Sequence, residues 1–290
     1  MEFNFILPEN FKEQSVSHLL EQTWLVPRKQ RHFLRIKKHF LVTDKAVSDD
    51  FILSAGDHVT VIFDAEDFPA LSVKMGDAKK ANILYEDEHL VIANKPEGMK
   101  THGNTPDEIA LQNHLAAACG QPVFVVHRLD EATSGAVLFA KNQFVLPILG
   151  RMFEQNEIHR EYLALSKGHF NKPNLIIDKP IGRDRHDNRK QIVSNSGKKA
   201  LTRLLVLKEY KNSSLVALLL DTGRTHQIRV HLSHLGHSII GDPLYGSAKA
   251  EPRLMLHAHK IILQHPFTGG NLEVSANSVS FEQELKKFKG

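Results

Sequence analysis

The segment over residues 125–142 places charged side chains between two apolar stretches. Its sequence, VVHRLDEATSGAVLFAKN, sets Arg128 and Asp130 two residues apart after one short apolar strand, and a polar turn leads into a second strand over 136–140. An aspartate beside a turn is most often a turn or capping residue. Here the carboxylate would lie where two buried strands meet and would be desolvated. A neighbouring arginine stabilises an ionised carboxylate, which can then act as a nucleophile or a base.

Arginines recur in a second compact segment, TGRTHQIRVH, which contains Arg224 and Arg229. Either side chain could supply the cation that pairs with a buried carboxylate. A glycoside hydrolase would need a second carboxylate as its acid partner. None stands out in the sequence, although spacing along the chain leaves that alternative open.

Metal chemistry is the rival interpretation, because the chain contains 18 histidines. His231, His234 and His237 recur every three residues, and His257 and His259 lie two apart on a predicted strand. The HExxH pattern of zinc enzymes is absent, since no glutamate follows the first of these histidines. We therefore expect hydrogen-bonding histidines and no metal, and keep a metal-dependent hydrolase as an alternative.

Two other kinds of site find no support in the sequence. The segment SNSGKKALT lacks the first glycine and the final Ser or Thr of a phosphate-binding loop, and there is no GxGxxG. With one cysteine, Cys119, the chain can form neither an intrachain disulfide nor a cysteine metal centre. We expect the protein to use no cofactor.

The composition indicates a folded chain with a mild basic excess. Of its 290 residues, 41% are hydrophobic, and the formal net charge of +4 permits a polyanionic partner without demanding one. No apolar run reaches the roughly 18 residues of an ordinary spanning helix, and the first residues do not resemble a secretion signal. We expect a cytoplasmic protein that contacts no membrane, with a monomer as the default.

The chain is predicted to have two domains. A small α+β domain over residues 1–68 combines two helical patterns, over 13–26 and 27–40, with short strands within 40–47 and 53–63. Residues 69–80 are polar and irregular and are interpreted as a linker. A larger domain then occupies 81–290.

The helix predicted over 27–40 would carry two distinct faces. Its basic face would be formed by Arg28, Arg31, Arg35 and Lys38. Its apolar face would be formed by Phe33, Ile36 and Phe40. A row of cations can be an ordinary solvated surface or can bind the phosphates of a nucleic acid, and the helical pattern alone does not distinguish the two.

The larger domain mixes strands, short helices and long loops. Residues 81–99 are typical of two strands and a Pro-Gly loop, 143–166 of a helix followed by a strand through Tyr162, and 214–236 of a strand, a tight turn and a helix. Strands outnumber helices without alternating strictly with them. The expected fold class is therefore α+β, with a mixed and mostly antiparallel sheet.

These segments resemble the RluA-type pseudouridine synthases. The block HRLDEATSGAVLFAKN resembles the motif of that family. Five further segments stand in the family's order: ILYEDEHLVIANKPEGMKTH, REYLAL, PIGRDRHDNRKQIVSNSGKKALT, LDTGRTHQIRVHLSHLGHSIIGDPLYG and RLMLHAHKI. The first domain resembles the alpha-L RNA-binding module of a ribosomal small-subunit protein. It departs from that module at one hairpin turn, where VTDK stands in place of Val-Asn-Gly-Lys.

The resemblance implies isomerisation of uridine to pseudouridine within RNA, without metal or cofactor. It assigns Asp130 as the nucleophile, attacking either the ribose anomeric carbon or the base, and Arg229 as the ion-pair partner of Asp130. Tyr162 would stack on the target base, with removal of the proton from the newly attached carbon as a second role. Leu256 would line the pocket. Arg128 would contact the RNA backbone or fill the gap left by the flipped uridine.

The same resemblance leaves the RNA target open. Large-subunit ribosomal RNA and transfer RNA are both modified by this family, and ribosomal RNA is the preferred expectation. The alternative function is a catalytically silent RNA-binding or ribosome-assembly factor of the same fold. The presence of Asp130, Tyr162 and Arg229 favours the enzyme.

Overall fold

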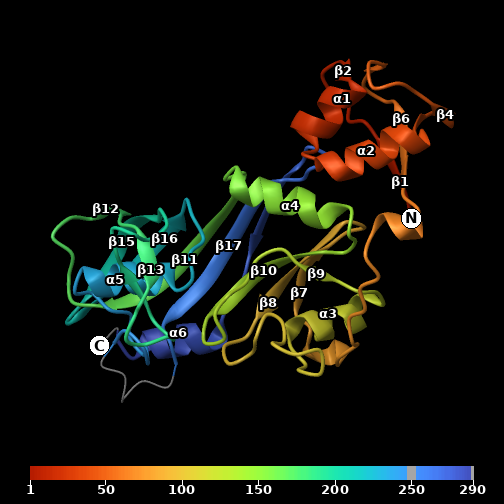
Figure 1. The fold of residues 1–290 in the computed structure, drawn as a ribbon. Helices are drawn as coiled ribbons and strands as arrows, with labels where there is room; N and C mark the ends of the chain where they lie inside the picture. The colour runs from red at the N-terminus through yellow and green to blue at the C-terminus, as the bar shows by residue number, and fades with distance from the viewer. Residues whose placement is uncertain (247–252, 289–290) are drawn as a thin grey trace.

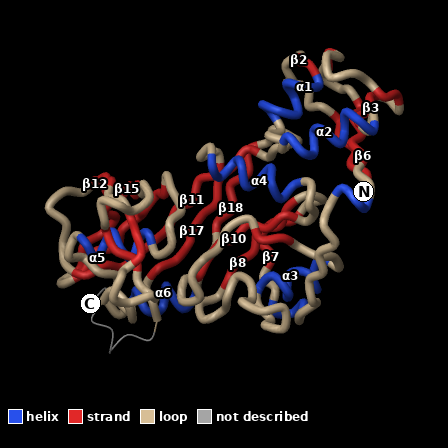
Figure 2. Tube along the Cα trace, in the orientation of Figure 1, coloured by secondary structure: helices blue, strands red, loops and turns tan. Residues whose placement is uncertain are grey.

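A large, mostly antiparallel sheet forms the centre of the molecule (Figures 1 and 2). The computed structural model describes residues 1–246 and 253–288. The sheet has ten strands, eight of which lie side by side in this order: β12 (Asn174–Asp178), β15 (Leu201–Tyr210), β16 (Ser213–Leu220), β11 (Ile158–Lys167), β17 (Leu256–Gln264), β10 (Ser134–Ala140), β8 (Leu90–Lys95) and β7 (Ile83–Glu86). β9 (Phe124–Val125) pairs with β10, and β18 (Asn271–Ser275) pairs with β17. The predicted α+β class is confirmed.

Both faces of the central strands are covered by helices. Along β8, Leu90 and Ile92 face the core under α4 (Val145–Glu154), whereas Val91 and Ala93 face the core that includes α3 (Leu111–Cys119). Because successive side chains of a strand point to opposite faces, a strand covered on both sides is apolar throughout. This explains why every residue of β10 is buried. The remaining helices of this region are α5 (Gln227–His234) and α6 (Val279–Lys286).

One small hairpin completes the larger region. The hairpin of β13 (Ile181–Arg183) and β14 (Gln191–Val193) stands apart from the main sheet and packs beside α5. The long insertion between β12 and β15 therefore ends up close to the helix that carries Arg229.

The N-terminal region forms a separate four-stranded sheet in the order β1-β6-β3-β4. The N-terminal region as a whole contains these elements in chain order: β1 (Glu2–Ile6), β2 (Gln14–Ser15), α1 (Val16–His18), the π-helical turn η1 (Leu19–Thr23), α2 (Arg28–Lys37), β3 (Phe40–Val42), β4 (Lys45–Ala46), β5 (Ile52–Leu53) and β6 (His58–Ile62). The two predicted helices form over the central parts of their patterns. The first strand was not predicted, although Phe3 and Phe5 alternate with exposed residues as expected for a half-buried strand.

The hairpin turn that departs from the related module still forms. Thr43 and Asp44 join β3 to β4, and both have positive φ, 47° and 63°. Two consecutive left-handed residues match the twist of a two-residue hairpin. Aspartate tolerates this conformation better than most residues, so the absence of glycine does not prevent the turn.

The prediction for the basic helix was wrong at its C-terminal end. α2 ends at residue 37, because Lys38 adopts a left-handed conformation and its N–H caps the preceding turn. Phe40 therefore lies on β3 instead of the helix, and Ile36 is 64% exposed. The buried positions of α2 are Gln30 and Leu34. Of the predicted apolar face, only Phe33 packs against the core from the helix, where it is partly buried, and the basic row loses Lys38.

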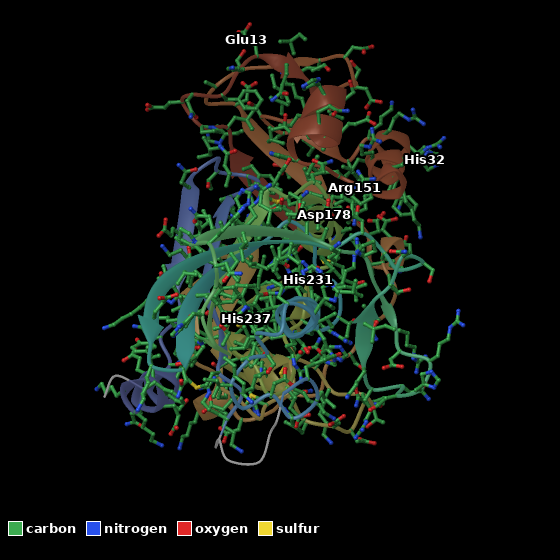
Figure 3. The ribbon with its side chains drawn as sticks, turned by 90° about the vertical axis from the view of Figure 1, so that its left-hand side faces the viewer. Glu13, His32, Arg151, Asp178, His231 and His237 are labelled. Carbon is green, nitrogen blue, oxygen red and sulfur yellow. The ribbon has the colours of Figure 1, made fainter. Side chains whose placement is uncertain are left out.

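The two regions share one hydrophobic core. Phe5 lies 4.7 Å from Phe267, and Phe3 lies 5.1 Å from Phe144, measured between ring centroids. Arg151 of α4, labelled in Figure 3, donates from Nη1 to the backbone carbonyls of residues 25 and 26 at 3.3 Å. The division of the chain into a domain over 1–68, a linker over 69–80 and a domain over 81–290 stays a prediction. The packing described here joins the two predicted domains through one core.

The segment interpreted as a linker packs along the larger region. The carbonyl of Pro69 accepts from the Gln143 side chain at 3.1 Å, and the carbonyl of Lys74 accepts from Asn113 of α3 at 2.8 Å. Gly76 donates its N–H to the carbonyl of Asn113 at 2.8 Å. Among the described residues, no helix is both long enough and apolar enough to cross a membrane.

Candidate active site

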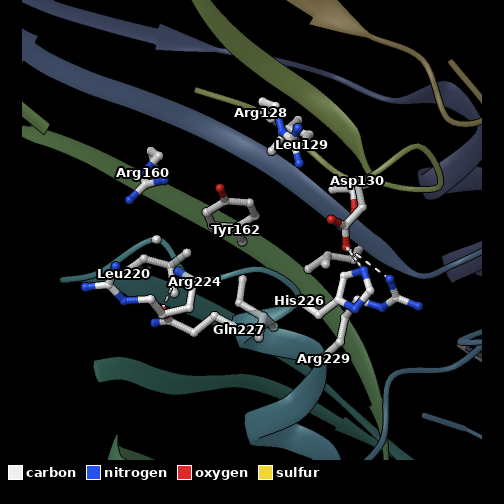
Figure 4. Close-up of a pocket in the computed structure, with 14 residues that line it drawn as sticks. Arg128, Leu129, Asp130, Arg160, Tyr162, Leu220, Arg224, His226, Gln227 and Arg229 are labelled. Carbon is white, nitrogen blue, oxygen red and sulfur yellow. Dashed lines mark hydrogen bonds and ion pairs between the residues drawn. The ribbon is translucent and has the colours of Figure 1, made fainter. Parts of the chain in front are cut away.

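One pocket brings together six residues that the sequence singled out, among them Arg224 on the loop between β16 and α5 (Figure 4). Asp130 and Arg128 lie on the loop between β9 and β10, Tyr162 on β11, Arg229 on α5 and Leu256 at the start of β17. These elements are far apart in the chain. They converge because β11, β17 and β10 are neighbours in the sheet and α5 packs against the same core.

A buried lysine fixes the loop that carries Asp130. Lys95, at the end of β8, is fully buried, and its Nζ donates to the carbonyls of Pro96, Met99 and Glu131 at 2.6–3.0 Å. Burial lowers the pKa of Lys95 to about 8. Thr133 donates its N–H to the Asp130 carbonyl at 3.0 Å and closes the turn. The backbone on either side of the carboxylate is therefore held in place.

Asp130 forms an ion pair with Arg229. The distance from Asp130 Oδ2 to Arg229 Nη1 is 3.0 Å, and the Asp130 side chain is 28% exposed while that of Arg229 is 5% exposed. The carboxylate therefore keeps a free, accessible edge, and the guanidinium supports it from the protein side. The pair is a charge-assisted hydrogen bond, which holds the carboxylate in place at the pocket.

A second carboxylate, which the sequence analysis did not identify, holds Arg229. Asp242 is completely buried and accepts from Arg229 Nε and Nη2, each at 2.8 Å. Burial alone would lower the pKa of Arg229, but Asp242 and Asp130 outweigh it and raise that pKa above its usual value. The motif GDPLYG contains Asp242, and its position after the Arg229 segment could have suggested the partner.

His226 and Tyr245 form a further layer behind Asp130. The Nε2 atom of His226 lies 3.6 Å from Asp130 Oδ2, and its Nδ1 lies 2.9 Å from the Tyr245 hydroxyl oxygen. His226 has a positive φ of 55°, an uncommon conformation for a residue other than glycine. Burial lowers the pKa of His226, so its ring is neutral near pH 7. The guanidinium of Arg229 lies 5.2 Å from the Tyr245 ring centroid.

Tyr162 forms one wall of the pocket and is only 5% exposed. Burial raises the pKa of its hydroxyl, and the positive charge of Arg160 opposes part of that rise. The phenol is therefore protonated in the free protein. Its ring provides an apolar and aromatic surface beside Asp130, which suits stacking with a planar base.

The pocket opens into a wider groove with a positive rim. Arg128, Arg160 and Arg224 line both the pocket and the groove. Arg128 is exposed, and its Nη1 lies 3.1 Å from His102 Nε2. A cationic groove that leads to a small pocket is suited to a polyanion from which one unit enters the pocket.

The predicted RNA-binding residues of α2 lie on a different surface. Arg28, Arg31 and Arg35 line a hollow together with Glu21. Arg31 is ion-paired with Glu21, with Nη2 3.0 Å from Oε1, so part of its charge is neutralised. Lys38 does not line this hollow. Only the two other arginines of the row remain exposed on the helix.

Several histidines suggested as metal ligands have other partners. His231 is buried between Thr202 Oγ1 and the Lys179 carbonyl, each at 2.9 Å. His257 lies 2.8 Å from Ser134 Oγ. Over residues 1–246 and 253–288, no group of three or more His, Cys, Asp or Glu side chains has an arrangement that could hold a metal ion.

Comparison with known proteins gives consistent matches. The profile for RNA pseudouridylate synthase matches residues 89–234, and the profile for the RluD ribosomal pseudouridine synthase N-terminal domain matches residues 3–59. The uncharacterized RNA pseudouridine synthase YhcT of Bacillus subtilis is 39% identical over 85% of this chain and 83% of its own length.

Two further proteins extend this similarity. The ribosomal large subunit pseudouridine synthase C of Vibrio cholerae is 32% identical, covering 98% of this chain and 96% of its own length. The solved structure of human RNA pseudouridylate synthase domain containing 1 superposes with a TM-score of 0.60 at 27% identity. That match covers 75% of this chain and 98% of the human chain.

Proposed function

This chain belongs to the RNA pseudouridylate synthase family, and from that premise we propose that it isomerises specific uridines of large-subunit ribosomal RNA with Asp130 as nucleophile. The observation that carries the proposal is the accessible Asp130 carboxylate, paired with Arg229 and set beside Tyr162 in one pocket. Relatives named as ribosomal large subunit pseudouridine synthases support the choice of RNA. Transfer RNA remains the second target to test.

The uridine must leave the stack before it can reach the pocket. Extruding a nucleotide costs a few kcal/mol, which aromatic stacking and filling of the vacated space offset. Tyr162 supplies the stacking surface, and Leu256 also lines the pocket. Arg128, on the exposed rim, is placed to contact the backbone or to occupy the vacated position.

Isomerisation requires cleavage of the glycosidic bond, rotation of the base and formation of a carbon–carbon bond to the same ribose. The product has the same composition as the substrate, because the newly attached base carbon loses a proton to solvent and the ring nitrogen released from the ribose gains one. Asp130 attacks either the anomeric carbon or the base, and Arg229 holds it in position by a charge-assisted hydrogen bond. Tyr162 is the candidate base for the departing proton, and because its hydroxyl is protonated in the free protein, it must first release its own proton to solvent in the RNA complex.

Release of tritium tests the reaction. RNA labelled at the exchangeable base carbon of uridine should lose label to water with the wild-type protein and not with Asp130→Asn, because the amide removes the nucleophile but keeps the side-chain shape. Equal release by both proteins would remove Asp130 from the mechanism. No release from any cellular RNA would reject the proposed function and favour an RNA-binding factor without activity.

Sequencing would identify the target. RNA from a strain that lacks the protein, treated with chemistry that marks pseudouridine, should lose marks at defined positions of large-subunit ribosomal RNA. Loss at transfer RNA positions alone would redirect the proposal to that substrate.

A further inference from the structure

Two arginines lie across Tyr162 from the catalytic ion pair. In Figure 4, Arg160 and Arg224 are on one side of the Tyr162 ring, and Asp130 and Arg229 are on the other. If a base stacks on this ring with its ribose at Asp130, then part of that nucleotide, or of a neighbouring nucleotide, lies close to these two guanidinium groups.

The charge of Arg160 is not compensated by any carboxylate in the described parts of the chain. Its guanidinium lies 4.9 Å from the Phe153 ring centroid, and its Nε is buried without a hydrogen-bond partner among those residues. Other arginines of the same region are paired: Arg229 with Asp242, and Arg203 with Asp221. A buried donor without a partner is costly, so Arg160 has a vacant bonding capacity that a ligand can fill.

Arg224 increases the positive charge at the same place. Its Nε donates to the Lys199 carbonyl at 2.9 Å, and across the described ranges no carboxylate forms an ion pair with it. The residue before it, Gly223, approaches Arg160 so closely that a Cβ atom would lie 3.2 Å from Arg160 Nη1. Because glycine has no side chain, position 223 leaves room for the Arg160 guanidinium.

We propose that Arg160, assisted by Arg224, binds a backbone phosphate of the RNA next to the flipped uridine. This inference rests on the proposed function, and it adds a phosphate subsite to it. A phosphodiester carries the negative charge that these two guanidinium groups have no partner for. Its oxygens can accept hydrogen bonds from the planar guanidinium N–H groups. A neutral base carbonyl would leave both charges uncompensated. Both arginines also line the outer groove, where the backbone must lie if one nucleotide enters the pocket.

The first test is the salt dependence of RNA binding. Arg160→Gln should weaken binding about tenfold and reduce the slope of log K against log salt by about 0.7 to 0.9, as for one lost phosphate contact. Arg160→Lys should retain the slope, because it keeps the charge, but bind more weakly than wild type. The matched control is Arg203→Gln, which removes an exposed arginine already paired with Asp221 at 2.8 Å. An unchanged slope for Arg160→Gln, or an equal change for the control, would overturn the proposal.

The second test neutralises the phosphate instead of the arginine. A stem-loop RNA containing the uridine identified by sequencing is prepared with a methylphosphonate linkage on the 5′ or the 3′ side of that uridine. One of these RNAs should bind the wild-type protein about tenfold more weakly, whereas Arg160→Gln should bind it as well as the unmodified RNA. Equal loss for both proteins would show that Arg160 does not contact the phosphate.

The outcomes separate this inference from the proposed function. If the wild-type protein releases no tritium, the proposed function fails, while the salt dependence still decides whether Arg160 contacts phosphate. If tritium release depends on Asp130 but neither the slope nor the methylphosphonate effect depends on Arg160, the function stands and the phosphate subsite is wrong. A lower turnover of Arg160→Gln with unchanged RNA affinity would also contradict the subsite, because the arginine would then act through Tyr162.

Discussion

At the scale of single residues, the site depends on a chain of charges. Asp130 is accessible and paired with Arg229, and Arg229 is held on its other edge by Asp242. The outer carboxylate lines the pocket, whereas the inner one is completely buried. The same side-chain type therefore has two roles, which its surroundings determine.

Replacing the buried carboxylate should cost far more stability than replacing the exposed one. Asp242→Asn leaves a buried guanidinium without its main counter-charge, and we expect the free energy of unfolding to fall by about 3 kcal/mol or more. Asp130→Asn should change it by less than about 1 kcal/mol, because that carboxylate is partly solvated. Urea denaturation of both variants measures the difference. Similar losses for the two would mean that Arg229 does not depend on Asp242.

At the scale of elements, the basic helix retains fewer free cations than its sequence indicates. α2 ends before Lys38, and Arg31 is paired with Glu21. Arg28 and Arg35 remain exposed beside the same hollow. If this helix binds RNA, these two arginines and Lys29, which is exposed beside the same hollow, should supply its contribution.

Removing both arginines tests the role of the helix. The double variant Arg28→Gln and Arg35→Gln should weaken binding to RNAs of different sequence to a similar extent, and should reduce the salt slope by about 0.7 to 0.9 for each lost contact. Binding titrations at several salt concentrations measure this, with Arg203→Gln as the control. A slope equal to that of wild type would indicate an ordinary solvated face.

At the scale of the whole molecule, the N-terminal region and the main sheet share one core. Phe5, Trp24 and Phe267 form a continuous aromatic contact, in which the Trp24 and Phe267 rings lie 5.3 Å apart. His89 belongs to the same cluster, and burial lowers its pKa to about 4, so it is neutral near pH 7. A shared core means that neither region keeps its buried surface without the other.

We expect the two regions to unfold together. Trp24 is the single tryptophan of the chain and lies in the N-terminal region, so its fluorescence reports on that region, whereas far-UV circular dichroism reports largely on the main sheet. The two urea transitions should coincide, as in cooperative two-state unfolding. Phe267→Ala should shift both midpoints together and cost about 3 to 5 kcal/mol. Two separate transitions would show that the core between the regions contributes little.

The sequence by itself determined most of the local structure around the site. The strand pair before the Pro-Gly loop, the helix and strand through Tyr162, and the strand, turn and helix through Arg229 all form where the apolar patterns predicted them. Such patterns are local, because a half-buried strand or helix must expose one face and bury the other. The ordered motifs likewise indicated the family.

Tertiary structure alone decided which side chains meet. The pairing of Arg229 with Asp242, the place of Arg160 across Tyr162 from Asp130, and the core that joins Phe5 to Phe267 are contacts between residues distant in the chain or fixed by packing. The residue at which α2 ends could not be predicted from the sequence pattern either, because the left-handed conformation of Lys38 ends the helix and directs the chain into β3. Helical periodicity reports which residues share a face, but it does not report where the backbone leaves the helix or what covers that face.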